Sequence, residues 1–140
     1  MASAAVMAAV DSVIAANWTH TPVFAPNVTG SVPADNTAFL TVTYPVAIEA
    51  QKSFGAPGSN TFREEGAFRI VLSVPIGTAV NPTATPWATW IDELRALFRG
   101  KTFSGVTTFE AAPARITDSS DDGAYFEMSI SVAYWFDVLG

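Results

Sequence analysis

Residues 124–138 read AYFEMSISVAYWFDV and carry the clearest secondary-structure signal in the chain. Every even position from Phe126 to Val138 holds an apolar residue, whereas most positions between them are polar or small. Strict alternation of this kind is the period of a β-strand that buries one face and exposes the other. The stretch therefore predicts a long strand in a sheet that is covered on one side.

Two further runs upstream show the same alternation. Residues 38–52 and 62–76 flank a Gly/Pro/Ser-rich segment at 53–61, and this arrangement predicts a hairpin with a long, mobile tip. Pro45 lies within the first run, and proline cannot donate a hydrogen bond to a neighbouring strand. We therefore expect an edge position or a bulge there.

Residues 86–99 predict an amphipathic helix. Thr85 and Pro86 suit the start of this helix, and Gly100 suits its end. The Ala-rich residues 2–17 predict a first helix. The apolar positions at helical spacing in the second helix are Trp87, Trp90, Ile91, Leu94, Leu97 and Phe98.

The order of elements predicts one α+β domain spanning residues 1–140. A weaker strand at 103–117 and the strand at 124–138 would form a second hairpin, which gives the order α-β-β-α-β-β. We expect a four-stranded, largely antiparallel sheet of two hairpins, with two helices packed on one face. Residues 18–37 contain three prolines and predict an extended loop or arm, anchored by Trp18 and Phe24.

Reactive side chains do not form a recognisable motif. The chain has one histidine, His20, and no cysteine, so it lacks the ligands of a usual zinc site. Asp118, Asp121 and Asp122 do not match the spacing of a calcium-binding loop. No Gly-x-Ser-x-Gly sequence marks a nucleophile. We therefore expect no catalytic residue, no cofactor, no metal and no enzymatic activity.

Charge and composition exclude two further classes of function. The net charge is −6 and the seven basic residues are scattered along the chain, whereas proteins that grip nucleic acid need clustered Lys and Arg. No apolar stretch is long enough for a membrane span. No basic residue precedes Lys52, so a secretory signal is not expected.

Low charge favours assembly with other subunits. Charged residues make up only 14% of the chain, below the usual quarter for globular proteins, which leaves much neutral surface to be covered. Tyr125 and Trp135 also lie on the otherwise polar face of the last predicted strand. Two interpretations of these aromatic side chains stay open. Another subunit or the predicted arm covers them, or they simply pack at an edge of the sheet.

Several segments resemble, in order, the tail terminator-like proteins of siphophages and gene transfer agents. The resemblance covers most of the chain and rests on packing and turn residues. One segment matches the family's R-x-x-G-x-(aromatic) strand entry. The matching segments are the Ala-rich first helix, residues 17–18 (NW), 21–23 (TPV), 62–70 (FREEGAFRI), 74–77 (VPIG), 94–100 (LRALFRG) and 134–137 (YWFD).

This resemblance implies a structural protein of the virion tail, assembled in the cytoplasm of the bacterial host. Such proteins form a homo-oligomeric ring, expected to be a hexamer, on the last ring of the tail tube protein. The ring stops tube polymerisation and joins the tail to head-completion or connector proteins. DNA passes through its lumen without specific binding, and an acidic lumen would suit that passage.

The resemblance carries no functional residue over to this chain. We expect Phe54, Phe62 and Trp135 to lie near contacts between subunits. Two alternative functions stay open. The first is another tail or head-tail connector subunit, such as a tail tube protein, and the second is a monomeric ligand-binding module.

Overall fold

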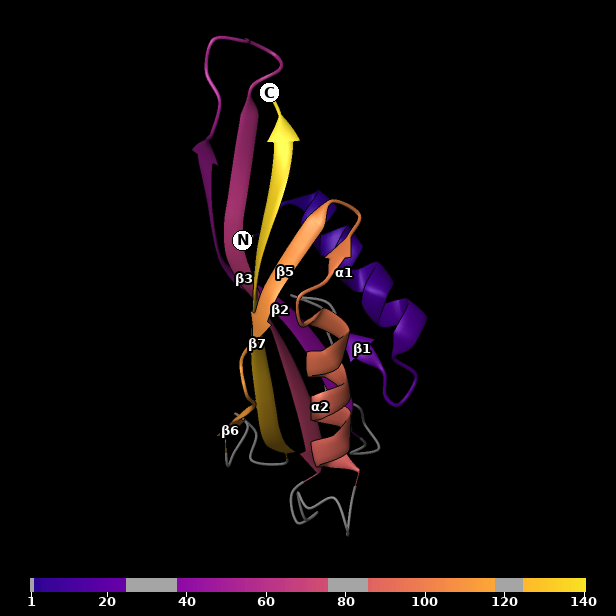
Figure 1. Ribbon diagram of the computed structural model, residues 1–140. Coiled ribbons are helices and arrows are strands. Elements are labelled where there is room, and N and C mark those ends of the chain that lie inside the picture. Colours follow the sequence, from indigo (N-terminus) through magenta and orange to yellow (C-terminus); the bar gives the residue numbers. More distant parts are fainter. Residues whose placement is uncertain (1, 25–37, 76–85, 118–124) are drawn as a thin grey trace.

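The computed structural model describes residues 2–24, 38–75, 86–117 and 125–140 (Figure 1). Most of the predicted arm lies outside these residues, as do Thr85 and the three aspartates Asp118, Asp121 and Asp122. In chain order, the elements are α1 (Ala4–Asn17), β1 (Val23–Phe24), β2 (Phe39–Gln51), β3 (Thr61–Pro75), α2 (Trp87–Phe98), β4 (Thr102–Phe103), β5 (Val106–Ala111), β6 (Arg115–Thr117) and β7 (Tyr125–Leu139).

The prediction of a four-stranded, largely antiparallel sheet in the order α-β-β-α-β-β is wrong. The described residues form a seven-stranded sheet in the order β1-β2-β3-β7-β5-β4, with β6 paired to β7. The sheet is mixed because Val23 and Phe24 of β1 run parallel to Leu40 and Thr41 of β2. A two-residue strand is too short to show an alternation, so the sequence pattern did not indicate it.

The single strand predicted at 103–117 is divided into β4, β5 and β6. Ser104 and Gly105 have φ angles of 47° and 82° and reverse the chain between β4 and β5. Positive φ at both central positions is the geometry of a tight hairpin turn. Pro113 lies in the break between β5 and β6, where no ladder hydrogen bond is required of it.

The centre of the sheet is formed by β2, β3 and β7. β3 and β7 pair antiparallel without interruption from Thr61↔Leu139 to Pro75↔Tyr125. β2 pairs antiparallel with β3, and its register shifts between Thr43 and Val46. This irregularity flanks Pro45, where the sequence predicts an edge position or a bulge.

Both helices cover one face of the sheet (Figure 1). Alternate strand residues point toward them and form one continuous core with the helices. This arrangement buries the apolar stripe of α2 and one side of α1. The largest fully buried side chains are Tyr134, Phe68, Phe98, Ile14, Leu40, Ile70, Leu72, Leu94, Met128, Ile130 and Val6.

The ends of β2, β3 and β7 continue beyond the helices (Figure 1). We call this part the three-stranded tip; it comprises residues 46–51, 61–66 and 135–140 together with the connecting loop 52–60. Asn60 and Gly140 exchange two backbone hydrogen bonds of 3.0 and 2.9 Å at its end. The helices do not reach the outer end of this tip in Figure 1, whereas β5 still pairs with Trp135 and Phe136 at its base.

Candidate interaction surface

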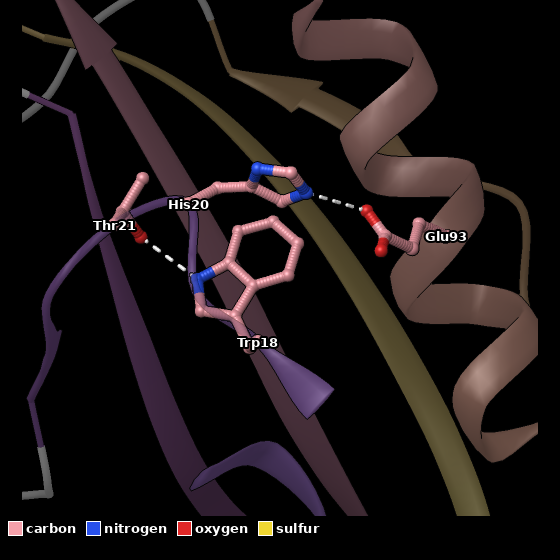
Figure 2. Close-up of polar contacts among 4 residues, drawn as sticks. All are labelled: Trp18, His20, Thr21 and Glu93. Carbon is pink, nitrogen blue, oxygen red and sulfur yellow. Dashed lines mark hydrogen bonds and ion pairs between the residues drawn. The ribbon is translucent and has the colours of Figure 1, made fainter. Parts of the chain in front are cut away.

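His20 joins the segment after α1 to α2. Its Nε2 atom lies 2.9 Å from a carboxylate oxygen of Glu93 (Figure 2). Its ring stacks on Trp90 with a centroid separation of 4.6 Å. Trp18, which is buried, donates from Nε1 to Thr21 Oγ1 at 2.9 Å. These contacts give His20 a structural role at the junction of two elements.

Within residues 2–24, 38–75, 86–117 and 125–140, no three His, Cys, Asp or Glu side chains gather as metal ligands. No helix in the same part of the chain is long and apolar enough to cross a membrane.

Trp135 lies on the sheet face opposite the helices. The guanidinium carbon of Arg63 sits 3.3 Å from the centroid of the Trp135 ring, a cation–π contact. Phe109 packs against the same ring edge-on, with centroids 5.5 Å apart. Trp135 is therefore half-buried by its own chain, and its remaining surface is available to a partner.

Arg63 also binds Asp137 on the neighbouring strand. Arg63 Nε and an Nη donate to the two carboxylate oxygens at 2.7 and 2.8 Å. These hydrogen bonds hold the pKa of the Asp137 carboxyl below its ordinary value and raise the pKa of Arg63. The two-point geometry fixes the Arg63 side chain over Trp135.

We expect Asp137→Asn to reduce stability only where the carboxylate is ionised. The pKa of Asp137 is lower in the folded state, so its contribution is present above the unfolded value of about 4 and is lost as pH falls through the folded value. Urea unfolding at pH 7 and pH 3 measures the difference from wild type, which should shrink at pH 3. Asp92→Asn is a matched control, because that carboxylate lies 3.6 Å from Arg95 on an exposed helix surface. An equal difference at both pH values would contradict this prediction.

The three residues predicted at subunit contacts do not form one surface. Phe54 lies in the tip loop and is 77% exposed. Phe62 pairs with Val138 in the neighbouring strand. Its side chain lies on the same face of the sheet that the helices cover below the tip. Trp135 lies on the opposite face. The structure brings all three to the tip region.

The adjacent residues Glu64 and Glu65 of β3 point to opposite faces of the sheet and have different environments. Glu64 is buried and accepts hydrogen bonds from Tyr134 Oη at 2.6 Å and from the backbone nitrogen of Ser3 at 3.2 Å. Glu65 points to the other face and is exposed. The carboxylate of Glu64 thus ties the N-terminus of α1 to the central strands, a role that sequence reasoning did not assign.

Gly66 permits a close approach of β2 to β3. A Cβ atom at Gly66 would lie 2.3 Å from the carbonyl oxygen of Val46 and 3.1 Å from Tyr134 Oη. The backbone of β2 comes this close because its register shifts just before Val46. A glycine inside a strand is a signal of such an approach, and the sequence offers that signal here.

The outstanding surface features in the described residues are apolar and aromatic side chains at the sheet edges and the tip. The exposed members are Val23, Val46, Ile48, Phe54, Phe109, Ile116, Val138 and Leu139. Exposed apolar groups on a stable domain are typical of proteins that assemble with other subunits. The fold and this surface are typical of a structural class of protein.

Comparison with known proteins identifies the family within this class. The family described as phage tail terminator protein matches residues 3–134. The chain belongs to this family and is a structural component of the bacteriophage virion tail. The resemblance found in the sequence is confirmed.

Similarity to solved structures supports the fold alone. Thirteen chains of solved structures match. One, whose name describes no function, is 20% identical, with a TM-score of 0.60 over 100% of this chain and 99% of its own. None of the curated proteins matches the chain significantly.

Proposed function

We propose that this protein forms a ring, expected to be a hexamer, that caps the head-proximal end of the tail tube. Membership of the tail terminator family is the observation that carries this proposal. In this role the ring stops further polymerisation of the tube protein. The exposed apolar residues of the tip supply surface that a neighbouring subunit can cover.

The ring has two kinds of partner besides its own copies. One side rests on the tail tube protein, and the other meets a head-completion or connector protein. DNA leaves the head through the lumen without specific contacts. The net charge of −6 supports this role, because like charges repel and so oppose adhesion of DNA to the wall. Assembly takes place in the cytoplasm of the bacterial host.

Light scattering coupled to size-exclusion chromatography, with negative-stain imaging, tests the proposal. The protein is measured across concentration, alone and with tail tube protein. A closed ring of about six subunits, or a ring seated on tube ends that stops their growth, is the expected result. Long tubes formed by this protein alone would favour a tail tube protein instead. A monomer that leaves tube growth unchanged would overturn the proposal and favour a ligand-binding module.

We expect Phe54→Ala and Trp135→Ala to weaken ring formation by at least about tenfold in concentration, because aromatic anchors carry much of an interface's energy. The measurement is the concentration at which rings dissociate. Ile116→Ala is the matched control, since Ile116 is also exposed, at 60%, but lies outside the tip. Rings as stable as wild type in both aromatic variants would count against these contacts. Phe62→Ala extends the test to the opposite face.

A further inference from the structure

The hydrogen bonds at the end of the tip establish which backbone groups point outward. Asn60 and Gly140 exchange hydrogen bonds, and the Lys52 nitrogen donates to the Thr61 oxygen at 2.7 Å. Groups in an antiparallel pair alternate between facing the partner strand and facing away. Even residues of β3 in the tip therefore bond toward β7, and odd residues bond toward β2.

The same alternation assigns the outer edge of β2. Lys52 bonds inward, so Ala50, Ile48 and Val46 also bond toward β3. Ala47, Glu49 and Gln51 therefore direct their N–H and C=O groups away from the sheet. No strand among the described residues pairs with β2 on this side beyond the two-residue contact of β1 at Leu40 and Thr41.

β7 presents a second open edge on the other side of the tip. Gly140 bonds toward β3, so Asp137 and Leu139 direct their backbone groups to the opposite side. The pairing of β5 with β7 reaches Phe136, through Val106, and goes no further within the described residues. Among the described residues, the tip is thus a ribbon of three strands whose outward donors and acceptors are unpaired along β2 and at Asp137 and Leu139 of β7.

Within the part of the chain that the structure describes, the β2 edge of the tip lacks the features that usually block pairing between edges. Proteins protect such edges with lysine, proline, bulges or a covering element. Here Pro45 and the register shift lie at the base of the tip, whereas the segment 46–51 contains a single charge, Glu49. Ile48 is 66% exposed there, and Leu139 on the other edge is 68% exposed.

We propose that the two edges of the tip bind each other between copies of this chain, the β2 edge of one copy pairing with the β7 edge of the next. The proposal rests on the proposed ring, because two different edges on one subunit form the head-to-tail contact from which closed rings are built. A second copy is the partner that fits, since each copy carries both halves of the contact.

The direction of the strands and the side chains agree with this pairing. β2 and β7 each run antiparallel to β3, so they run parallel to each other. Subunits of a ring whose strands run along the axis with a tilt, as in a barrel, keep that direction and pair in parallel. Ile48 pairs with Glu65, which pairs with Trp135, so Ile48 and Leu139 lie on one face. Ile48 is level with Trp135, four residues short of Leu139, and β5 already pairs with Trp135. The tilt staggers neighbouring copies along the strands, and a stagger of four residues pairs the free β7 edge with β2 and brings Ile48 beside Leu139.

Glu49→Pro tests the main-chain contact. It removes an outward N–H group, which β2 does not use within the subunit, so the monomer should keep its circular dichroism spectrum. Rings should then require at least a hundredfold higher concentration than wild type. Glu49→Ala is the matched control, because it removes the side chain and keeps the N–H group, and it should form rings normally. Folded Glu49→Pro protein that forms rings as readily as wild type would overturn the proposal.

Cross-linking tests the same contact without proline. The chain contains no cysteine, so Ile48→Cys and Leu139→Cys each introduce a single thiol. A short bismaleimide should join the two variants when they are mixed, and should leave each variant alone uncross-linked. Cross-linking within Ile48→Cys alone would indicate a symmetric contact between β2 edges, and its presence would overturn the proposal. So would rings of the mixed variants that yield no cross-link.

The two proposals fail in different ways. If wild-type protein forms no ring, alone or on tube ends, the proposed function fails. If wild-type protein forms rings and these tests give the contrary results, only the edge contact is wrong.

Discussion

Gly66→Ala is expected to lower the free energy of unfolding by about 3 kcal/mol, at the upper end of the usual cost of overpacking. The added Cβ would lie 2.3 Å from the carbonyl oxygen of Val46 and 2.9 Å from the Cα of Ala47. Both are backbone atoms, so β2 itself must move to make room. Urea unfolding followed by circular dichroism measures the change.

Gly58→Ala separates this clash from the conformational cost of losing a glycine. Gly58 has a φ of +84° and no atom within 4 Å of a Cβ placed there, so only the left-handed backbone opposes the change. That cost is about 1–2 kcal/mol. Gly66 does not have a left-handed φ. A loss at Gly66 no larger than the loss at Gly58 would show that β2 yields easily.

Tyr134→Phe is expected to lower the free energy of unfolding by about 2 kcal/mol, because it leaves a buried carboxylate short of a donor. The hydroxyl of Tyr134 donates to Glu64 at 2.6 Å. Burial and this hydrogen bond raise the pKa of Tyr134 well above its usual range, so the hydroxyl keeps its proton. The Ser3 nitrogen is then the remaining donor to the same oxygen, at a longer 3.2 Å.

Tyr44→Phe is the matched control for that change. Burial also raises the pKa of Tyr44, but its hydroxyl makes only contacts of 3.5 Å with Met7 O and Asp11 Oδ1. Contacts of that length are weak hydrogen bonds. Its loss should cost under about 1 kcal/mol. Equal losses in the free energy of unfolding of the two variants would mean that the hydrogen bond to Glu64 adds no more stability than the weak contacts of Tyr44.

The long strands were predictable because their signal is local and repeated. The alternation at 124–138 predicted β7, and the runs at 38–52 and 62–76 correspond to β2 and β3 within one or two residues. Helical spacing similarly predicted α2, which spans Trp87–Phe98. Each of these elements buries one face against a common core, so the spacing of its own apolar residues shows whether it is a strand or a helix.

The short strands were not predictable in this way. β1, β4 and β6 contain two or three residues each, and their pairing depends on a neighbour supplied by distant sequence. Val23 and Phe24 became a strand because the edge of β2 lies beside them. The error in strand number and in sheet type follows from this dependence.

Some features of the candidate surface could likewise be predicted from the sequence, and others could not. An exposed Phe54 and a Trp135 on the polar side of an alternating strand could be inferred from sequence. The register between β3 and β7 determines three other features of this surface. It places Arg63 over Trp135 and Glu64 beside Tyr134. It also places Phe62 and Trp135 on opposite faces of the sheet. Register fixes which side chains meet, and a single chain segment does not contain it.

The sequence by itself determined the long elements, the low charge, the lack of a reactive motif and the resemblance to tail terminators, because these reside in local periodicity and residue type. Tertiary structure alone decided the seven-stranded mixed sheet and the two open edges of the tip. It also decided the close approach at Gly66. These features arise where residues far apart in the chain come into contact, and their energy belongs to the pair and not to either residue.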